Sequence, residues 1–364
     1  MAQPIDFDQL IVIAPNLKKR LSGVTSTIVQ LIPLQRATGL GIAAAGAGLP
    51  NTLVKIPFWS WTKLYRRPAD GKPRIWHARR NTEMLSGLFM RHLLRIPLKL
   101  VFTSASQRQH TAYTKWLIRR MDAVIATSQK TAAYLQVPNT VIMHGIDTER
   151  FCPPTDKAKA KTAVGLPSDK KIVGCFGRVR AQKGTDLFAE AMISALRDRP
   201  DWIAIIAGRA TEAHQQFQKQ LQTQITDAGM DERILFVGEH TDIERWYQAL
   251  DLFIAPQRWE GFGLTPLESM ACGVPVIATD VGAFSELVVE GETGHILPDL
   301  NMQTMADSAG KMMDEDETRA TMAKASRVHM TTHFPIVREV KQLAEVYARV
   351  SDRAVSDLFK EGSA

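Results

Sequence analysis

The chain has 364 residues, more than a typical single domain, so its length favours two domains that each bury a hydrophobic core. Hydrophobic residues make up 45% and charged residues 23%, which excludes the biased compositions of disordered and fibrous chains. The three cysteines, Cys152, Cys175 and Cys272, lie far apart without a Cys-x-x-Cys pair, so neither a disulfide framework nor a zinc site is indicated.

Charge is divided unevenly along the chain. The formal net charge is +7, but residues 1–150 contain 21 lysines and arginines against 7 acidic residues, whereas the remainder is net acidic. Such a basic first half attracts nucleic acid, an acidic lipid surface or an acidic substrate, and composition alone leaves all three open. The N-terminus lacks a basic and apolar leader, and the uncharged stretch 37–54 is too rich in glycine for a membrane span. We therefore expect a cytoplasmic protein.

The first half predicts a parallel α/β sheet, because short apolar strands alternate with helical segments. The predicted strands are 10–14, 42–45, 75–77, 98–103, 123–127 and 141–143. The predicted helices are 24–36, 82–94, 108–120 and 128–135. Residues 152–171 contain adjacent prolines and several lysines, and they predict a linker with a small surface element.

A second series of strands follows, at 172–176, 203–207, 234–237, 252–255, 276–278 and 294–297. These strands are almost uniformly apolar, as expected where helices cover both faces of a sheet. After residue 301 the pattern is helical, and the segment 335–359 is long enough to return across the junction between the halves. The prediction is an α/β fold with two Rossmann-like, doubly wound domains facing across a cleft. One domain is 1–160 plus a C-terminal helix at about 340–364, and the other is 161–339.

Ligands of such sheets bind beyond the carboxyl ends of the strands, where loops expose backbone amides and helix N-termini. The strand at 172–176 is followed by Gly177-Arg178 and then by Lys183-Gly184, which leads into a helix. Two cations beside a helix N-terminus suit a diphosphate, because charge, dipole and amides act together. A solvent-exposed basic turn is the alternative.

The segment 260–268, EGFGLTPLE, is the strongest candidate for a site. Its glycines allow a close approach of the backbone to a ligand, and carboxylates at Glu260 and Glu268 can hold vicinal hydroxyls of a sugar or ribose. Thr265 and Glu268 also match a capping box with Pro266 at the first helical position, so helix capping is the structural alternative for Glu268. Capping does not account for Glu260.

Residues 172–297 resemble the C-terminal donor domain of retaining glycosyltransferases of the GT-B fold, family 4. The resemblance depends on Gly177-Arg178 with Lys183-Gly184, on the Glu-x7-Glu segment 260–268, and on the GETG segment 291–294. The segment VIMHGIDTERF at 141–151 is similar to the end of the family's first domain, with His144 where an asparagine is usual. WHARRN at 76–81 and the stretch 103–128 resemble bacterial lipopolysaccharide core mannosyltransferases.

The resemblance implies that Arg178 and Lys183 hold the donor pyrophosphate, that Glu260 holds sugar hydroxyls and that Glu268 holds the ribose diol. Backbone amides that would meet the sugar or phosphate belong to Phe262, Gly263 and Leu264. In the first domain, Gly23 resembles a family glycine that lets the diphosphate approach. The family has a tandem glycine there, whereas this chain has Ser22-Gly23.

The implied reaction moves a hexose from a nucleotide diphosphate to a hydroxyl with retention at the anomeric carbon. Two cations and a helix N-terminus meet the charge that develops on the leaving diphosphate, so we expect no cofactor and no metal. The resemblance favours attack from the same face, with the leaving phosphate helping to deprotonate the acceptor. His77, at the end of the strand 75–77, is the candidate contact to the donor sugar or acceptor, and a structural histidine is the alternative. His110 and His144 are the next candidates.

The resemblance at 76–81 implies GDP-mannose as the donor, with a UDP- or ADP-hexose as the alternative. We expect the basic first domain to hold an anionic, lipid-linked lipopolysaccharide core at the inner face of the cytoplasmic membrane, with peripheral contact to anionic lipid. A sugar-nucleotide epimerase or phosphorylase on the same fold and a basic nucleic-acid-binding protein are competing interpretations. The chain has no recognised nucleic-acid motif, so we expect no nucleic-acid partner. A dinucleotide enzyme is less consistent, because Gly39-x-Gly41 is followed by Ala44 in place of the third glycine.

Overall fold

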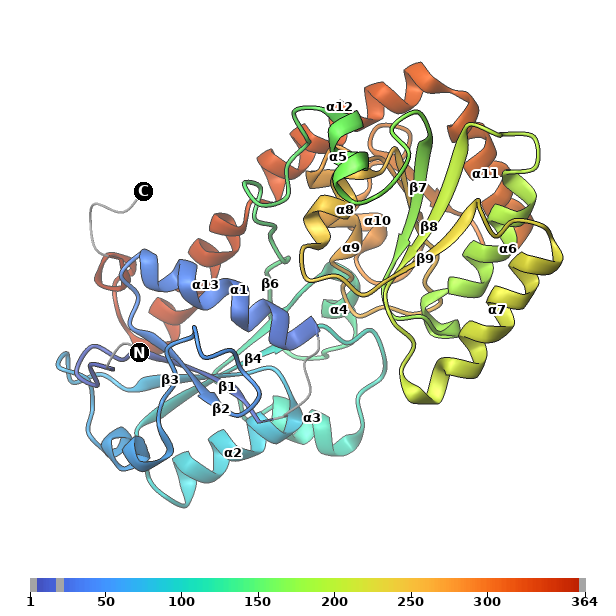
Figure 1. Ribbon diagram of the computed structural model, residues 1–364. Helices are drawn as coiled ribbons and strands as arrows, with labels where there is room; N and C mark the ends of the chain where they lie inside the picture. The colour runs from blue at the N-terminus through green and yellow to red at the C-terminus, as the bar shows by residue number, and fades with distance from the viewer. Residues whose placement is uncertain (1–4, 18–22, 360–364) are drawn as a thin grey trace. The chain divides into compact units, whose positions relative to one another are not determined.

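The computed structural model describes residues 5–17 and 23–359, which form two compact units (Figure 1). Unit 1 is Met1–Met143 with Ile336–Ala364, and unit 2 is His144–Pro335. The sequence predicted these divisions after residues 160 and 339. The segment 144–151 belongs to unit 2 because it bonds there: the Ile146 amide donates to the Phe334 carbonyl at 2.8 Å, and the rings of Phe151 and Tyr247 lie 6.1 Å apart.

Unit 1 is built on a six-stranded sheet in which every pair of neighbouring strands is parallel. In spatial order the strands are β2 (Ile42–Gly46), β1 (Val12–Asn16), β3 (Arg74–Ala78), β4 (Leu98–Ser104), β5 (Ala123–Ala126) and β6 (Thr140–Val141). The order reverses between β1 and β3, where β1 has β2 on one side and β3 on the other. This reversal is where a doubly wound sheet opens a crevice for ligands.

Helices cover both faces of the unit 1 sheet (Figure 1). One face packs on α1 (Gly23–Ala37), α13 (Ile336–Ser351) and η4 (Val355–Leu358). The other face packs mainly on η1 (Phe58–Tyr65), α2 (Asn81–His92) and α3 (Ala112–Ile118), with α4 (Gln129–Ala133) at its edge. Successive strand residues alternate between these two cores, as Ile75 and Trp76 do in β3.

The C-terminal helix α13 packs in unit 1, the domain to which the sequence assigned a helix at about 340–364; the observed helix ends earlier, at Ser351. Its inner face contributes Val340, Leu343 and Tyr347 to the core beneath α1. Arg353, just beyond the helix, anchors the end of this segment, because its buried guanidinium binds Asp70 at 2.6 Å. The last segment of the chain is therefore an integral part of the unit that contains the first strand.

Unit 2 contains a second six-stranded parallel sheet. In spatial order its strands are β12 (Gly294–Leu297), β11 (Val276–Thr279), β10 (Leu252–Ala255), β7 (Lys171–Phe176), β8 (Trp202–Ala207) and β9 (Ile234–Gly238). The order reverses between β7 and β10. The parallel α/β arrangement predicted for both halves is confirmed.

Two layers of helices enclose the unit 2 sheet (Figure 1). One layer consists of α6 (Thr185–Ala195), α7 (Gln215–Asp227) and α11 (Met302–Asp314), and α12 (Asp316–His333) packs on both α11 and the helix at 265–271 of the other layer. The other contains α5 (Lys157–Ala163), α8 (Ile243–Ala249), α9 (Thr265–Ala271) and α10 (Phe284–Leu287). Short 3-10 turns, η2 (Ala181–Lys183) and η3 (Glu212–His214), precede α6 and α7. On the second face Phe176, Tyr247 and Phe253 form an aromatic cluster with ring centroids 4.6–5.6 Å apart.

Of the prediction for 152–171, the small surface element is confirmed and the linker is wrong, because the segment lies within unit 2. This segment contains α5, which packs on α8. Lys161 is 5% exposed and binds Asp251 at 2.8 Å, and the same carboxylate accepts a hydrogen bond from the Ile172 amide at 2.8 Å. The lysines suggested a solvated surface because their acidic partner lies 90 residues further along the chain, where no local pattern marks it.

In the part of the chain that the structure describes, every helix is too short or too polar to cross a bilayer.

Candidate functional site

The two loops that the sequence singled out lie together in unit 2. Loop 177–184 follows β7 and loop 256–264 follows β10, the two strands between which the sheet order reverses. Because both strands are parallel, their carboxyl ends share one edge. We call the reversal point between the two loops the crevice, because this is the position at which doubly wound sheets bind ligands. The topology therefore brings the predicted diphosphate loop beside the predicted sugar loop.

Lys183 and Glu260 form an ion pair across this crevice. The Lys183 ammonium donates to Glu260 Oε2, and the side chains are 21% and 19% exposed. The other carboxylate oxygen, Oε1, accepts a hydrogen bond from the Gly261 amide at 3.0 Å. A lysine and a glutamate that are largely buried but still reach solvent can bind a phosphate and a sugar hydroxyl, respectively.

Arg258 supplies a second link between the loops, which sequence analysis missed. Its guanidinium binds Asp186 at 2.6 and 2.8 Å, and its backbone amide donates to the Gln182 carbonyl at 3.1 Å. Asp186 lies in the first turn of α6. The only sequence signal for this link was the opposite charge of two residues, one beside each motif. The link holds the two loops together without using Lys183 or Glu260.

Arg178 lies on the same loop as Lys183 and is exposed to solvent. It directly follows Gly177, whose φ of 143° belongs to a conformation that favours glycine. No described residue forms an ion pair with Arg178 or a hydrogen bond to its side chain. The structure thus leaves this guanidinium available at the edge of the crevice.

Gly263 is required by the shape of the second loop. Its φ is 88°, and a Cβ built there would lie 2.2 Å from Phe284 Cε1 and 2.9 Å from Glu260 Cγ. The sequence predicted that a ligand approaches the backbone closely at this glycine. In the structure, the side chains of Phe284 and Glu260 occupy that space. The lack of a side chain allows Glu260 to lie against the loop backbone.

The backbone amides of Phe262, Gly263 and Leu264 precede α9 and have no hydrogen-bond acceptor within residues 5–17 and 23–359. The Phe262 carbonyl accepts from the Ala283 amide at 2.9 Å, which holds the loop in place. The Phe262 ring is 4% exposed and meets the His144 ring edge-on at 4.8 Å. His144 thus packs against this loop through the Phe262 ring.

Glu268 does not cap a helix, so the capping-box interpretation is wrong. Helix α9 begins at Thr265 with Leu264 at its N-cap, and no side chain caps it. Thr265 is one residue inside the helix, where its buried Oγ1 has no hydrogen-bond partner among the described residues. The pattern failed because the helix starts one position earlier than a Thr265 cap requires.

The Glu268 carboxyl is held by Tyr247 instead. The Tyr247 hydroxyl donates to Glu268 Oε2 at 2.8 Å, and the tyrosine is fully buried. Removal from water raises the pKa of the Glu268 carboxyl, and the hydrogen bond from Tyr247 opposes that rise. The protein thus fixes one of the two carboxylate oxygens, Oε2. Tyr247 was missed because it lies 21 residues before Glu268 with no shared motif.

In unit 1, His77 lies inside the protein. It is 1% exposed, its Nδ1 is 2.7 Å from the Tyr347 hydroxyl, and its Nε2 is 2.7 Å from Thr103 Oγ1. Burial lowers the pKa of His77 well below its ordinary value. Both ring nitrogens have protein partners, which matches the structural alternative stated for this residue. Its predicted contact with substrate gains no support from this geometry.

His110, in the loop between β4 and α3, differs from His77. Its Nε2 is buried and lacks a hydrogen-bond partner among the described residues. Burial and the neighbouring charges of Arg108 and Lys115 lower the pKa of His110. His110 thus has a ring nitrogen without a partner among the described residues, whereas both ring nitrogens of His77 have one.

A charged side chain, Arg80, lies at the reversal point of the unit 1 sheet, where the sequence showed only a basic pair. Arg80 follows β3 and donates to Asn16 Oδ1 at 2.7 Å and to the buried Glu83 at 2.9 Å. Asn16 ends β1, so this contact joins the two strands at the reversal point. Gly23 begins α1 on the same side, and the segment 18–22 before it lies outside the described residues.

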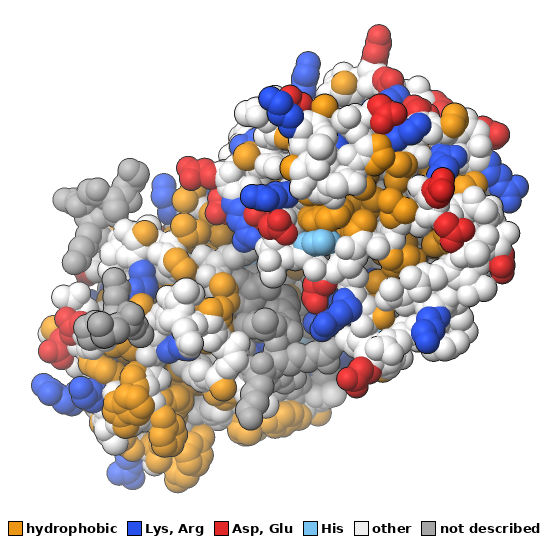
Figure 2. Space-filling view, viewed as in Figure 1, with side chains coloured by type: hydrophobic (Ala, Val, Ile, Leu, Met, Phe, Trp, Pro, Cys, Tyr) orange, Lys and Arg blue, Asp and Glu red, His pale blue; other side chains and the backbone are white. Residues whose placement is uncertain are grey.

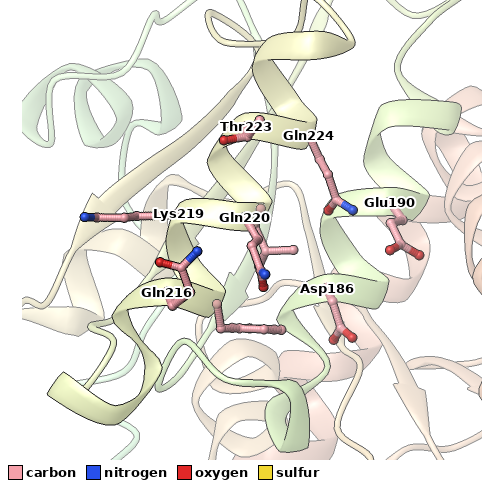
Figure 3. Close-up of a pocket in the computed structure, with 9 residues that line it drawn as sticks. Asp186, Glu190, Gln216, Lys219, Gln220, Thr223 and Gln224 are labelled. Atoms are coloured by element: carbon pink, nitrogen blue, oxygen red, sulfur yellow. The ribbon is translucent and has the colours of Figure 1, made fainter.

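A separate pocket of about 500 Å³ lies between α6 and α7 (Figure 3). Asp186, Glu190 and Lys219 line it together with glutamine side chains of α7. Asp186 is already bound to Arg258, and none of the predicted donor residues lines this pocket. It is therefore distinct from the crevice at the ends of β7 and β10.

Comparison with known proteins places this geometry in context. Residues 156–329 match the family described as Glycosyl transferases group 1. The chain is 59% identical over 347 residues to the lipopolysaccharide core biosynthesis mannosyltransferase LpsB of Rhizobium meliloti (strain 1021), covering 94% of this chain and 98% of that protein. It is 48% identical over 342 residues to the lipopolysaccharide core biosynthesis mannosyltransferase LpcC of Rhizobium leguminosarum bv. viciae, covering 94% and 97%.

The fold is also similar to that of a solved protein. The crystal structure of HepE from Anabaena, in complex with UDP, superposes with a TM-score of 0.79 over 93% of this chain and 100% of that chain, at 20% identity. The similarity at this level of identity concerns the fold. The two-domain GT-B fold expected from the sequence is confirmed.

Proposed function

The chain belongs to the group 1 glycosyl transferases, and we propose that it transfers a mannosyl residue from a nucleotide sugar onto a lipopolysaccharide core. The relatives named for this activity match almost the whole chain, including both units. The observation that carries the proposal is the accessible Lys183–Glu260 pair at the reversal point of the unit 2 sheet. It combines a phosphate-binding and a hydroxyl-binding group in one crevice.

GDP-mannose is the proposed donor. Lys183 and Arg178 would contact the pyrophosphate, Glu260 the mannosyl hydroxyls and Glu268 the ribose diol. The amides of 262–264, which have no acceptor among the described residues, would meet the sugar or phosphate. A UDP- or ADP-hexose is the alternative donor, and HepE has been solved with UDP.

Donor binding would exchange the Lys183–Glu260 contact for two contacts with the ligand. The ammonium would turn to the pyrophosphate and the carboxylate to the sugar, while Arg258 and Asp186 keep the loops joined. As the glycosidic bond breaks, negative charge grows on the leaving diphosphate. A fixed group aimed at such charge contributes about 3–4 kcal/mol to the stability of the transition state. We propose that these cations do this without a metal ion.

We further propose a retaining reaction. The acceptor hydroxyl would attack from the face that the diphosphate leaves, and a phosphate oxygen would take its proton. His110 would contact the acceptor hydroxyl, since its Nε2 has no partner among the described residues. The acceptor would be an anionic lipid-linked core, drawn by the basic unit 1 at the inner face of the cytoplasmic membrane.

The proposal is tested by incubating the purified protein with GDP-mannose, UDP-glucose and ADP-glucose, with and without purified core lipid. We expect acceptor-dependent release of GDP and a mannosylated lipid whose anomeric configuration matches that of the donor, in the presence of EDTA as well. Release of nucleotide from UDP-glucose or ADP-glucose instead would assign that compound as the donor. Failure of every nucleotide sugar to bind, with salt-dependent binding of oligonucleotides instead, would replace the proposal with the nucleic-acid alternative.

A further inference from the structure

One layer of unit 1 exposes a concentration of large apolar side chains. The elements η1, α2 and α3 cover the same face of the sheet and contribute Leu64, Leu88 and Leu117 to one core. Trp61 of η1 meets the buried Trp76 edge-on at 6.2 Å, and the Trp76 Nε1 donates to the Glu83 carbonyl of α2 at 2.8 Å. Shared contacts through Trp76 place η1 and α2 side by side.

The outward side chains of these three elements are apolar as well. They define an apolar ridge that consists of Phe58, Trp59, Leu85, Phe89, Leu93, Tyr113 and Trp116. Phe58 is 87% exposed and Trp59 is 81% exposed, and the others are 44–67% exposed. Figure 2 shows hydrophobic side chains gathered over the part of unit 1 that η1 and α2 occupy in Figure 1.

The part of the ridge on α2 is a continuous stripe. Leu85, Phe89 and Leu93 follow one another at intervals of four residues, so they form one stripe along the helix. Single exposed apolar residues are ordinary on soluble proteins, but a contiguous patch of this kind marks an interaction surface. Trp and Tyr side chains are typical of the boundary between lipid and water.

The charge around the ridge identifies its partner. The segments 58–67, 81–99 and 108–120 contain ten lysines and arginines and one acidic residue, Glu83, which is buried against Arg80. Asp122 pairs with two of these cations, Arg91 and Lys99. The exposed cations without that pairing include Lys63, Arg66, Arg67, Arg95, Arg119 and Arg120.

Aromatic and cationic groups are interleaved on this surface. The Arg120 guanidinium lies 4.0 Å from the centre of the Trp116 ring, on the exposed side of α3. A cation beside an interfacial ring can bind a lipid phosphate while the ring enters the acyl region. A second copy of this chain is a poor partner, because it would bring the same excess of positive charge to the contact.

We propose that the apolar ridge inserts into an anionic phospholipid membrane, with the flanking lysines and arginines at the headgroups. This inference rests on the proposed function, because membrane binding serves the reaction only if the acceptor is lipid-linked. Helix α2 begins at Asn81, directly after the Arg79-Arg80 pair at the carboxyl end of β3. Insertion of the ridge would therefore bring the ligand edge of this sheet near the headgroups, where a lipid-linked acceptor presents its sugars.

Insertion predicts a different salt response from a purely electrostatic attraction. Salt screens the cations but leaves burial of the ridge intact. We expect binding to vesicles of phosphatidylglycerol and phosphatidylcholine (1:1) to weaken as NaCl rises from 0.1 to 0.5 M and to persist in part. Binding that vanishes completely at high salt would overturn the insertion part of the proposal.

The decisive variants remove apolar surface without touching a core. Phe89→Ser with Leu93→Ser changes two exposed residues of the ridge, and we expect at least about a tenfold loss of vesicle binding in co-sedimentation. Val337→Ser is the matched control, because Val337 is 53% exposed on α13, which packs on the opposite face of the same sheet. The control should bind vesicles as the wild type does.

The cationic part is tested by Arg95→Gln with Arg119→Gln, for which we expect a several-fold loss at 0.1 M NaCl and little change at 0.5 M. Arg245→Gln on α8 is its control. Equal vesicle binding by wild type and the Phe89/Leu93 variant would overturn the proposal. So would a loss of self-association by that variant in sedimentation equilibrium without an effect on vesicles, since the ridge would then join copies of the chain.

Calorimetry with GDP-mannose separates this inference from the proposed function. The ridge variants should retain wild-type affinity for the donor, because all predicted donor residues except Gly23 lie in unit 2. If wild type binds vesicles through the ridge but no nucleotide sugar, the proposed function fails and the membrane surface stands. If wild type binds GDP-mannose but no vesicles, the membrane surface fails and the proposed function stands.

Discussion

The polar groups at the strand ends of the two sheets differ in their access to solvent. In unit 2, the charged and partly accessible Lys183 and Glu260 meet across the crevice. In unit 1, His77 lies between Tyr347 and Thr103 in a network that is buried from solvent. A charged pair that stays reachable can exchange its contacts for a ligand, whereas a buried network with every nitrogen satisfied stabilises the fold. The comparison predicts activity losses in one unit and stability losses in the other.

The largest effect is expected from Lys183→Ala and Glu260→Ala. Each should lower kcat/KM for mannosyl transfer by at least about a hundredfold, because each removes a fixed charge from the donor crevice. Arg178→Ala should act similarly. Melting temperatures should stay close to wild type, since the link through Arg258 remains.

Lys219→Ala is the control for lost positive charge, because Lys219 is exposed on α7, away from the crevice. It should transfer at the wild-type rate. Wild-type turnover in a folded Lys183→Ala protein would remove the phosphate role of this lysine.

The next effect is expected from Gly263→Ala. A Cβ at this position meets Phe284 and Glu260 at less than 3 Å, and its backbone conformation is strained for alanine. Destabilisation of about 2–4 kcal/mol and weaker donor binding should follow, read by urea unfolding and calorimetry.

Gly291→Ala separates strain from crowding. Gly291 also has a positive φ, 74°, but a Cβ there meets nothing within 4 Å. It should cost about 1 kcal/mol and leave donor affinity intact. Equal effects of the two substitutions would mean that packing against Glu260 is unimportant.

The fold was largely accessible from the sequence, and the reasons are physical. Strand 172–176 was found, as β7, because a run that is buried on both faces must be apolar throughout. The α5 segment was misjudged because its buried Lys161 depends on Asp251, and only the tertiary structure brings the two together. Local sequence patterns therefore predict which residues are buried, but they do not predict which distant residues pair with one another.

The site divides in the same way. Lys183 and Glu260 could be named because each belongs to a recognisable loop after a strand. Arg258 and Tyr247 could not, since they act through a partner in another element. The capping interpretation of Glu268 failed through a shift of one residue in the start of α9, which is the precision that propensities lack.

Tyr247→Phe tests the hydrogen bond between Tyr247, which the sequence did not indicate, and Glu268, which it did. Loss of the hydroxyl removes the hydrogen bond that fixes Glu268 Oε2, and donor affinity should fall about five- to tenfold with little change in kcat. Glu268→Gln should weaken donor binding further. Calorimetry with GDP-mannose and with mannose 1-phosphate gives the answer, because only the donor with ribose should respond. Unchanged affinity in both variants would return Glu268 to a structural role.

The smallest effect concerns pH and tests the buried network of unit 1. Burial lowers the pKa of His77 in the folded state below its unfolded value of about 6.5. Below that pH the unfolded chain therefore binds a proton that the folded chain resists, and the free energy of unfolding falls as pH falls, by at most about 1.4 kcal/mol per pH unit from this residue. His77→Gln removes this contribution, so its stability should depend less steeply on pH between 7.5 and 5.5 than that of wild type. His110 and His329, whose pKa values are also lowered, titrate in both proteins and cancel in the comparison.

Hydrogen exchange of the unit 1 amides across this range measures the difference, and parallel pH profiles would show that His77 is not held neutral by the fold. A loss of transfer activity in His77→Gln that exceeds its loss of folded protein would instead restore the predicted contact with substrate.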